Sequence, residues 1–189
     1  LSDSEIKKRI SNWEIWVTTS NKYVVKDQIG PASLDFRLGN TFRIYKKSRQ
    51  TEIDSKIWVD HDHIETIILE DWDKFVLHPW DFVLWATLES VKIPRDLVAR
   101  CEWRSSLGRL WIIIHSTAWF IDPWFEWTIT LEMTNINELP VALYTWMRIG
   151  QLAFETIHWK VDDPYNTRKW SKYMNQILPE ASRINKDLN

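Results

Sequence analysis

The segment TITLEMT, residues 128–134, places one carboxylate among hydroxyl groups at alternate positions. A period of two predicts a β-strand with Ile129, Leu131 and Met133 on one face and Glu132 on the other, polar face. A glutamate held there could act as a general base that takes a proton from an attacking water molecule. A solvated sheet surface is the alternative interpretation, because any half-buried strand shows the same alternation. The strand taken alone favours that alternative.

Two other segments carry groups that could bind an anion. RSSLGRL, residues 104–110, combines two guanidinium groups, two hydroxyls and one of only four glycines in a turn between strands. Arginine and serine donors suit a phosphate or a nucleotide, although a charged surface turn is the plainer interpretation. DDPYNTRKWSKYMNQ, residues 162–176, lies in a polar, donor-rich tail that begins near Lys160 and has no periodicity. By itself the tail predicts a frayed terminus.

Composition limits the classes of function. A chain of 189 residues predicts a single domain, residues 1–189, with a substantial core. A net charge of −2 argues against a protein that binds nucleic acid or a membrane surface through bulk charge. The one cysteine, Cys101, allows no internal disulfide and no cysteine-rich metal site. No signal-like leader and no 18-residue apolar run are present, so we expect a soluble, cytoplasmic protein.

The elements that must position these groups are mostly strands. LSDSEIKKRI, residues 1–10, predicts a short helix, with Ser2 and Glu5 at capping-box spacing and Leu1 and Ile6 as a hydrophobic staple. From about residue 50 the pattern changes to short strands separated by turn residues. They are TIIL, KFVLHP, DFVLWATLESV, LVARCEW, LWIIIHS, TITLEMTN and VALYTWMRIGQLAFETI. Strands without long helices between them predict an all-β antiparallel sandwich or barrel.

Tryptophan and glycine are present in reversed proportions. The chain has 14 Trp and 4 Gly, whereas glycine ordinarily makes up roughly 7% of residues. Trp72, Trp80, Trp124 and Trp146 stand beside Asp, Pro or Thr, at turn signals where glycine supplies positive φ. Bulky side chains at such points would add strain and overpacking of roughly 1–3 kcal/mol per site. Repeated across the barrel at most of the 14 tryptophans, this cost would exceed the roughly 5–15 kcal/mol by which a domain is stable.

Longer motifs carry a resemblance to a known family. QIGPASLDFRLGN, EWRSSLGRL, TAWFIDPWFEWTITLE, RIGQLAFE and PYNTRKWSKYMNQ follow in this order and are similar to motifs of the dCTP deaminase family, within the trimeric dUTPase superfamily. The resemblance covers nearly the whole chain. It implies a distorted β-barrel, related to a jelly roll, with a short N-terminal helix. It also implies a homotrimer with active sites between the subunits.

The same resemblance bears on the tryptophans. The family patterns EGRSSLGRLG, TAGFIDPGFEG, PGM and GSKY have glycine where this chain has Trp, and all 14 tryptophans can be matched in this way. We hypothesise that UGA codons, which some bacteria read as glycine, have been translated here as tryptophan. A deliberately altered chain is the rival explanation.

The family resemblance also implies a mechanism and a set of site residues. Zinc-dependent nucleobase deaminases need an H-x-E motif paired with C-x-x-C, and this chain, with one cysteine, has no such pair. The chain resembles instead a family that uses a metal-free route, in which the residue matching Glu132 is the general base. Ser105 would position the catalytic water, and Arg109 would lie near Glu132. The residues implied to line the phosphates and the water are Arg104, Ser105, Ser106, Leu107, Gly108 and Arg109.

Further contacts follow from the same comparison. Asp122 would accept a hydrogen bond from the deoxyribose 3′-hydroxyl, and the backbone of Thr130, Leu131 and Glu132 would meet the base. The tail, residues 160–189, would be a lid that orders on binding and closes over the triphosphate. Its implied contacts are Tyr165, Lys172 and Gln176. Mg²⁺ would arrive with the triphosphate rather than through protein ligands.

The sequence leaves two questions open: which product the enzyme would form, and whether the protein is catalytically active at all. Gln151, with Trp119 and Phe120, resembles the bifunctional type that forms dUMP and pyrophosphate in dUMP biosynthesis, whereas a monofunctional enzyme would release dUTP. A nucleotide-binding regulator without catalysis is a third possibility, against which Glu132, Ser105 and Arg109 speak. The family implies dCTP as substrate and feedback by dTTP. No nucleic-acid or membrane partner is expected.

Overall fold

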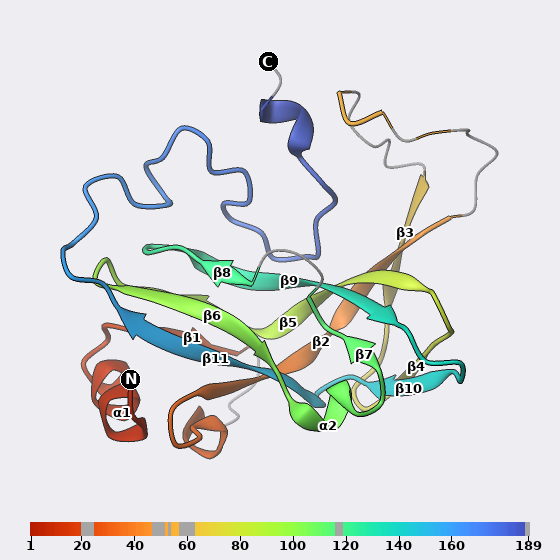
Figure 1. Cartoon of the computed structure of the whole chain (residues 1–189), viewed down its shortest axis with the longest axis horizontal. Helices are drawn as coiled ribbons and strands as arrows, with labels where there is room; N and C mark the ends of the chain where they lie inside the picture. Colours follow the sequence, from red (N-terminus) through yellow and green to blue (C-terminus); the bar gives the residue numbers. More distant parts are fainter. Residues whose placement is uncertain (20–24, 47–51, 53, 57–62, 116–118, 188–189) are drawn as a thin grey trace.

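The structure, a computed structural model, describes residues 1–19, 25–46, 52, 54–56, 63–115 and 119–187. Strands dominate the chain (Figure 1). The helical elements are α1 (Asp3–Ser11), η1 (Val25–Gln28), α2 (Ser105–Gly108) and η3 (Ile184–Asp187). The strands are β1 (Trp16–Thr18), β2 (Leu34–Tyr45), β3 (Ile64–Ile68), β4 (Lys74–Leu77), β5 (Phe82–Lys92), β6 (Leu97–Trp103), β7 (Ile112–Ile113), β8 (Phe120–Ile121), β9 (Glu126–Asn135), β10 (Val141–Tyr144) and β11 (Arg148–Thr156).

Nine strands form one curled antiparallel sheet. Its order is β7-β9-β5-β2-β11-β6-β8, with β1 added against β5 and β3 against β2, while β4 and β10 form a separate pair. The sheet curls around the core in the manner of an open barrel (Figure 1). The predicted all-β barrel with a short N-terminal helix is therefore confirmed. Of the helices within the described residues, none is long and apolar enough to span a membrane.

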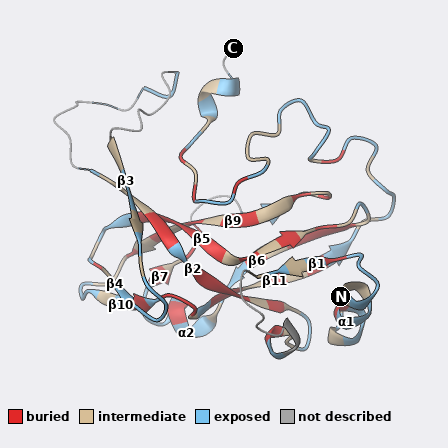
Figure 2. Ribbon diagram, turned by 180° about the vertical axis from the view of Figure 1, so that it is seen from behind, coloured by how far each residue is buried: buried red, intermediate tan, exposed pale blue. Residues whose placement is uncertain are grey.

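The core lies between the inner faces of the strands. Buried residues concentrate on β2, β5, β6 and β9, whereas the chain after β11 is mostly exposed or intermediate (Figure 2). The largest fully buried side chains are Trp85, Phe36, Phe42 and Phe154. Each comes from a strand of the large sheet, so burial of these side chains holds the curled sheet together.

The N-terminal helix and β9 form as the sequence predicts. Ser2 caps α1, and its side chain and that of Glu5 bond each other's backbone N–H groups in a capping box. Ile6 is fully buried, which packs the helix against the core. In β9, Ile129, Leu131 and Met133 are buried while Glu132 lies on the partly exposed face.

Three strand predictions need correction. The longest strand, β2, was missing from the predicted set, because it lies at the centre of the sheet and its mostly buried residues show no alternation. Residues 141–157 are two strands separated by a turn at Thr145–Trp146, whose N–H groups bond outside the ladder. Of the predicted strand 110–116, the structure describes residues 110–115, and among these only Ile112–Ile113 pairs as β7.

Seven tryptophans have left-handed backbone conformations. The described residues with positive φ other than glycine are Trp13, Trp72, Trp80, Trp111, Trp124, Trp127, Trp146 and Asn175, with tryptophan φ values from 60° to 116°. None of the four glycines has positive φ. A non-glycine residue held in this region costs on the order of 1–3 kcal/mol. Trp58 lies outside the described residues.

The tail, residues 160–187 in the structure, returns across β8 and β9 (Figure 1). The N–H of Tyr165 donates to the Pro123 carbonyl, 3.0 Å away. The Gln176 side chain donates to the Thr128 carbonyl at 2.7 Å, and the Thr128 hydroxyl donates back to the Gln176 carbonyl. The tail therefore docks on the strand that carries Glu132.

Candidate active site

A pocket of about 440 Å³ lies between the tail and the polar face of β9. β8 and the turn that follows it form another part of its wall. The sequence-predicted residues that line it are Phe120, Asp122, Thr130, Glu132, Tyr165 and Gln176. The structure thus gathers groups from positions 120 to 176 around one cavity.

Glu132 shares the pocket wall with a histidine that the sequence interpretation missed. The Nδ1 atom of His115 lies 3.7 Å from a carboxylate oxygen of Glu132, a separation that makes an ion pair when the imidazole is protonated. The His115 side chain is buried, whereas that of Glu132 is 29% exposed, and Nδ1 has no hydrogen-bond partner. A carboxylate beside a buried imidazole can hold or pass on a proton.

The strand register explains why His115 was missed. Ile112 pairs with Asn135 and Ile113 with Thr134, and continuing that antiparallel register brings His115 opposite Glu132. In the sequence His115 only ends an apolar run, LWIIIH, with no spacing signal to Glu132. Only the pairing of β7 with β9 could have identified it.

Gln176 is the main anchor of the tail at this wall. It is buried, and besides its bonds to Thr128 its side-chain oxygen accepts a hydrogen bond from the Thr130 hydroxyl at 3.4 Å. The N–H of Glu180 donates to the same hydroxyl. A nucleotide that contacted Thr130 or Gln176 would therefore meet a surface on which strand and tail are already joined.

Aromatic side chains line a further part of the pocket. The Tyr165 ring packs edge-on against Phe125, with centroids 5.7 Å apart, and its phenolic oxygen accepts a hydrogen bond from the N–H of Tyr173. Burial raises the pKa of Tyr165 and that of Tyr45, another wall residue. Both phenols therefore remain protonated at neutral pH, so they can donate hydrogen bonds to a ligand.

The remaining predicted phosphate contacts lie elsewhere in the chain. We call residues 104–109, which include α2, the α2 corner; Figure 1 places it at the end of the molecule opposite the tail. None of its residues lines the pocket with Glu132. Within one chain, therefore, Arg109 and Ser105 do not lie beside Glu132. A single subunit does not bring these predicted site residues together. Leu107 and Leu131 are buried in the core, so they can offer a ligand only backbone groups.

Three further predicted residues also lie off the pocket wall. Gln151, on β11, accepts a hydrogen bond from the Ser33 hydroxyl at 3.0 Å. Lys172, in the tail, forms an ion pair with Asp187. Trp119 is half-exposed before β8, and its carbonyl accepts from the N–H of Cys101. Residues 116–118, which precede it, lie outside the described residues.

The side chains that could ligate a metal do not cluster. Within the described residues, no three His, Cys, Asp or Glu side chains form a group that could hold a metal ion. Cys101 is buried, and burial raises the pKa of its thiol, so it stays a thiol rather than the thiolate that binds metals.

Comparison with known proteins identifies the family of this chain. The family model described as dCTP deaminase-like matches residues 1–157. The chain belongs to the dCTP deaminase-like family. It is 42% identical over 195 residues to a protein of Halobacterium salinarum named "dCTP deaminase, dUMP-forming", covering 99% of this chain and 95% of the relative. A protein of Dictyoglomus thermophilum with the same name is 44% identical over 187 residues, covering 99% of this chain and 95% of that protein.

A solved structure agrees on the fold. The crystal structure of 2′-deoxycytidine 5′-triphosphate deaminase from Agrobacterium tumefaciens superimposes with a TM-score of 0.65 at 22% identity. It covers 84% of this chain, and this chain spans about half of that one, 48%. At this identity the likeness concerns the fold alone.

Proposed function

We propose that this chain is a hydrolase that deaminates dCTP and cleaves the same nucleotide to dUMP and pyrophosphate. The observation that carries the proposal is the position of Glu132 on the wall of the pocket, in a chain similar along its length to proteins named "dCTP deaminase, dUMP-forming". dCTP and two waters would give dUMP, ammonia and pyrophosphate. The pathway served would be dUMP biosynthesis.

The deamination step assigns a role to each group in the wall. Glu132 would take a proton from water as the oxygen attacks C4 of cytosine, and would return protons to the ring nitrogen and to the departing ammonia. Its distance of 3.7 Å from His115 supports a role for the imidazole in holding the carboxylate. Asp122 would accept a hydrogen bond from the deoxyribose 3′-hydroxyl, since it lines the same pocket as Glu132.

The division of the predicted contacts supports a homotrimer with shared sites. The pocket holds the carboxylate and the tail anchors, while the α2 corner holds the arginines and serines. A site completed between subunits would bring Arg104, Ser105 and Arg109 of one chain to Glu132 of another. Cyclic symmetry would then build three equivalent sites.

Triphosphate binding would involve the tail and a divalent cation. Mg²⁺ would enter with the triphosphate and neutralise part of its charge, because Mg²⁺ prefers oxygen ligands such as those of phosphate groups. Tyr165, Lys172 and Gln176 would contact the nucleotide as residues 160–189 close, and Lys172 would then exchange Asp187 for phosphate. The same pocket would accept dTTP as a feedback ligand.

One incubation separates the candidate functions. The protein is mixed with dCTP and Mg²⁺, released ammonia is assayed, and the phosphorus products are followed by NMR. Ammonia with pyrophosphate and dUMP supports the proposal. Ammonia with intact triphosphate would leave a monofunctional deaminase that forms dUTP, and binding without ammonia would mark a regulator.

A further inference from the structure

Left-handed backbone positions in this molecule are occupied almost entirely by tryptophan. Of the eight non-glycine residues with positive φ in the described part of the chain, seven are Trp and one is Asn175. L-residues avoid this region because Cβ approaches the carbonyl oxygen, and glycine, Asn and Asp supply most exceptions. All four glycines of the chain adopt negative or extended φ. At these seven positions the backbone has a conformation that glycine adopts without strain and tryptophan does not.

Side-chain packing does not compensate for these conformations. Trp13, Trp72, Trp80 and Trp111 are each more than half exposed. Trp127 has the largest φ, 116°, and its buried indole N–H has no hydrogen-bond partner. Trp146 is the exception, because its side chain is buried and its indole N–H donates to Asp71 at 2.8 Å. For the exposed four and for Trp127, neither apolar burial nor a hydrogen bond explains why tryptophan stands at the turn.

We infer that the organism that makes this protein inserts glycine at the tryptophan positions, because it reads the corresponding codons, UGA, as glycine. The φ angles carry the inference for the seven left-handed positions independently of any family pattern. The family patterns have glycine at all 14 tryptophan positions, so we extend the same decoding rule to the whole set. The set includes Trp85, whose buried indole donates to the Gly39 carbonyl at 2.9 Å. We call the chain with these 14 replacements the glycine form and the chain with the present sequence the tryptophan form.

The test compares matched sets of replacements. One variant replaces the seven left-handed tryptophans by glycine, and a control replaces Trp16, Trp103, Trp119, Trp159 and Trp170, which have no positive φ. We expect the first set to raise the thermal midpoint, or to recover soluble protein where the tryptophan form aggregates, by more than the control. Equal or smaller gains would overturn the inference. So would UGG codons in the gene, since UGG specifies tryptophan.

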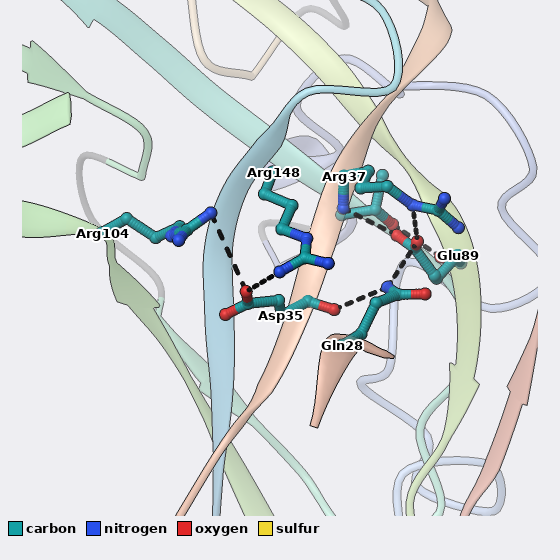
Figure 3. A network of polar contacts seen from close by, with 7 residues as sticks. Gln28, Asp35, Arg37, Glu89, Arg104 and Arg148 are labelled. Carbon is teal, nitrogen blue, oxygen red and sulfur yellow. Dashed lines mark hydrogen bonds and ion pairs between the residues drawn. The ribbon is translucent and has the colours of Figure 1, made fainter. Parts of the chain in front are cut away.

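A second, independent observation concerns two arginines that converge on one carboxylate. The Nη1 atoms of Arg104 and Arg148 lie 3.8 and 3.5 Å from the same Asp35 oxygen. Figure 3 shows both guanidinium groups pointing toward Asp35 from neighbouring segments. These separations exceed those of charge-assisted hydrogen bonds, so N–H groups of both arginines remain available to an anion.

A buried network fixes the position of Asp35. Its carbonyl accepts a hydrogen bond from the Gln28 amide at 2.8 Å, and that amide also donates to Glu89 at 2.9 Å. The Glu89 side chain is 1% exposed and pairs with Arg37 at 2.7 Å (Figure 3). These buried contacts hold the backbone of Asp35 in place. The side chains of Arg104 and Arg148, which approach its carboxylate, are partly exposed.

We propose that Arg148 binds the triphosphate together with Arg104, and that Asp35 is the positioning residue for both. Two guanidinium groups against one carboxylate leave an excess positive charge at the α2 corner, which suits a polyanion. This proposal rests on the proposed function and adds to it a phosphate contact from β11. The triphosphate would belong to dCTP in the pocket of a neighbouring subunit.

The matched control for Arg148 is Arg100. Both side chains are 43% exposed, but Arg100 pairs with Glu155 on the neighbouring strand. In the glycine form, Arg148→Ala should raise the KM for dCTP by about tenfold to a hundredfold, as expected for a lost charged hydrogen bond, and should weaken its dependence on ionic strength. Arg100→Ala should change neither. Equal effects of the two variants would overturn the proposal.

Two measurements separate this proposal from its premise and from a structural effect. Calorimetric titration with dCTP reports binding even when no ammonia is released, so failure of the proposed function leaves the role of Arg148 decidable. Asp35→Asn should raise KM with little change in kcat, and Asp35→Glu should restore part of the affinity. A fall in kcat alone, without a change in KM, would remove Asp35 from a positioning role.

Discussion

The Glu132 pocket and the α2 corner have opposite chemical characters. The pocket is lined by aromatic rings, by three partly exposed carboxylates (Asp122, Glu132 and Glu180) and by the buried imidazole of His115, and the tail covers it. The α2 corner is open, and Arg104, with Arg148 nearby, presents positive charge around Asp35. One region can move protons at a base and the other can hold phosphates. Neither region has both properties, so the proposed function predicts that a complete site forms where the two meet.

The largest expected effect is at Glu132. In the glycine form, Glu132→Gln should lower the rate of ammonia release by about 10²–10⁴-fold, because the amide cannot accept the proton of water. Affinity for dCTP should stay within a few-fold, since the side chain keeps its shape. Glu126→Gln, on the same strand but paired with Lys92, is the control. Retained deamination in Glu132→Gln would take the base role away from this residue.

Subunit mixing tests whether the two regions meet between chains. The Glu132→Gln and Arg109→Ala variants should each be nearly inactive, whereas unfolding and refolding them together should restore activity. Random assembly of equal amounts leaves about one site in four with both halves intact. Ammonia release is compared with that of separately refolded variants. Activity that stays at the level of the single variants would mean that the halves belong to one chain.

Removing the tail should have a smaller effect, on binding rather than assembly. Truncation before Tyr165 deletes the tail anchors at Thr128 and Thr130 but few core residues. We expect a folded oligomer of unchanged size and a strongly weakened affinity for dCTP. Size-exclusion chromatography and calorimetry measure the two properties. An oligomer that dissociates on truncation would make the tail part of the subunit interface.

The sequence was most informative where its pattern is local. Alternation in TITLEMT placed Glu132 on the correct face, and the Ser2–Glu5 spacing predicted the observed cap. β2 was not predicted, because burial of most of its residues removes the alternation. The proximity of His115 to Glu132 depends on the β7–β9 register, which no spacing in the chain encodes.

The relation between the two regions also lay beyond local reasoning. Arg109 and Glu132 were expected to lie close together, which is compatible with the structure only across a subunit boundary. The turn signals beside Trp72, Trp80, Trp124 and Trp146 were readable in the sequence, and each of these residues has positive φ. The backbone conformation followed from the flanking residues rather than from the tryptophans themselves.

The smallest expected effect comes from β6, the strand that runs from the neighbourhood of β8 to the α2 corner. Burial raises the pKa of the Cys101 thiol, so the native state keeps its proton when the unfolded chain has lost it. Stability from this group is therefore fully present below the ordinary thiol pKa and declines as pH rises above it. Thermal midpoints of the glycine form at pH 7 and pH 10, compared with those of Cys101→Ala, isolate the contribution. The midpoint should fall more steeply with pH when the cysteine is present. Parallel curves, or ready alkylation of the native thiol, would show that β6 opens to solvent between the two regions.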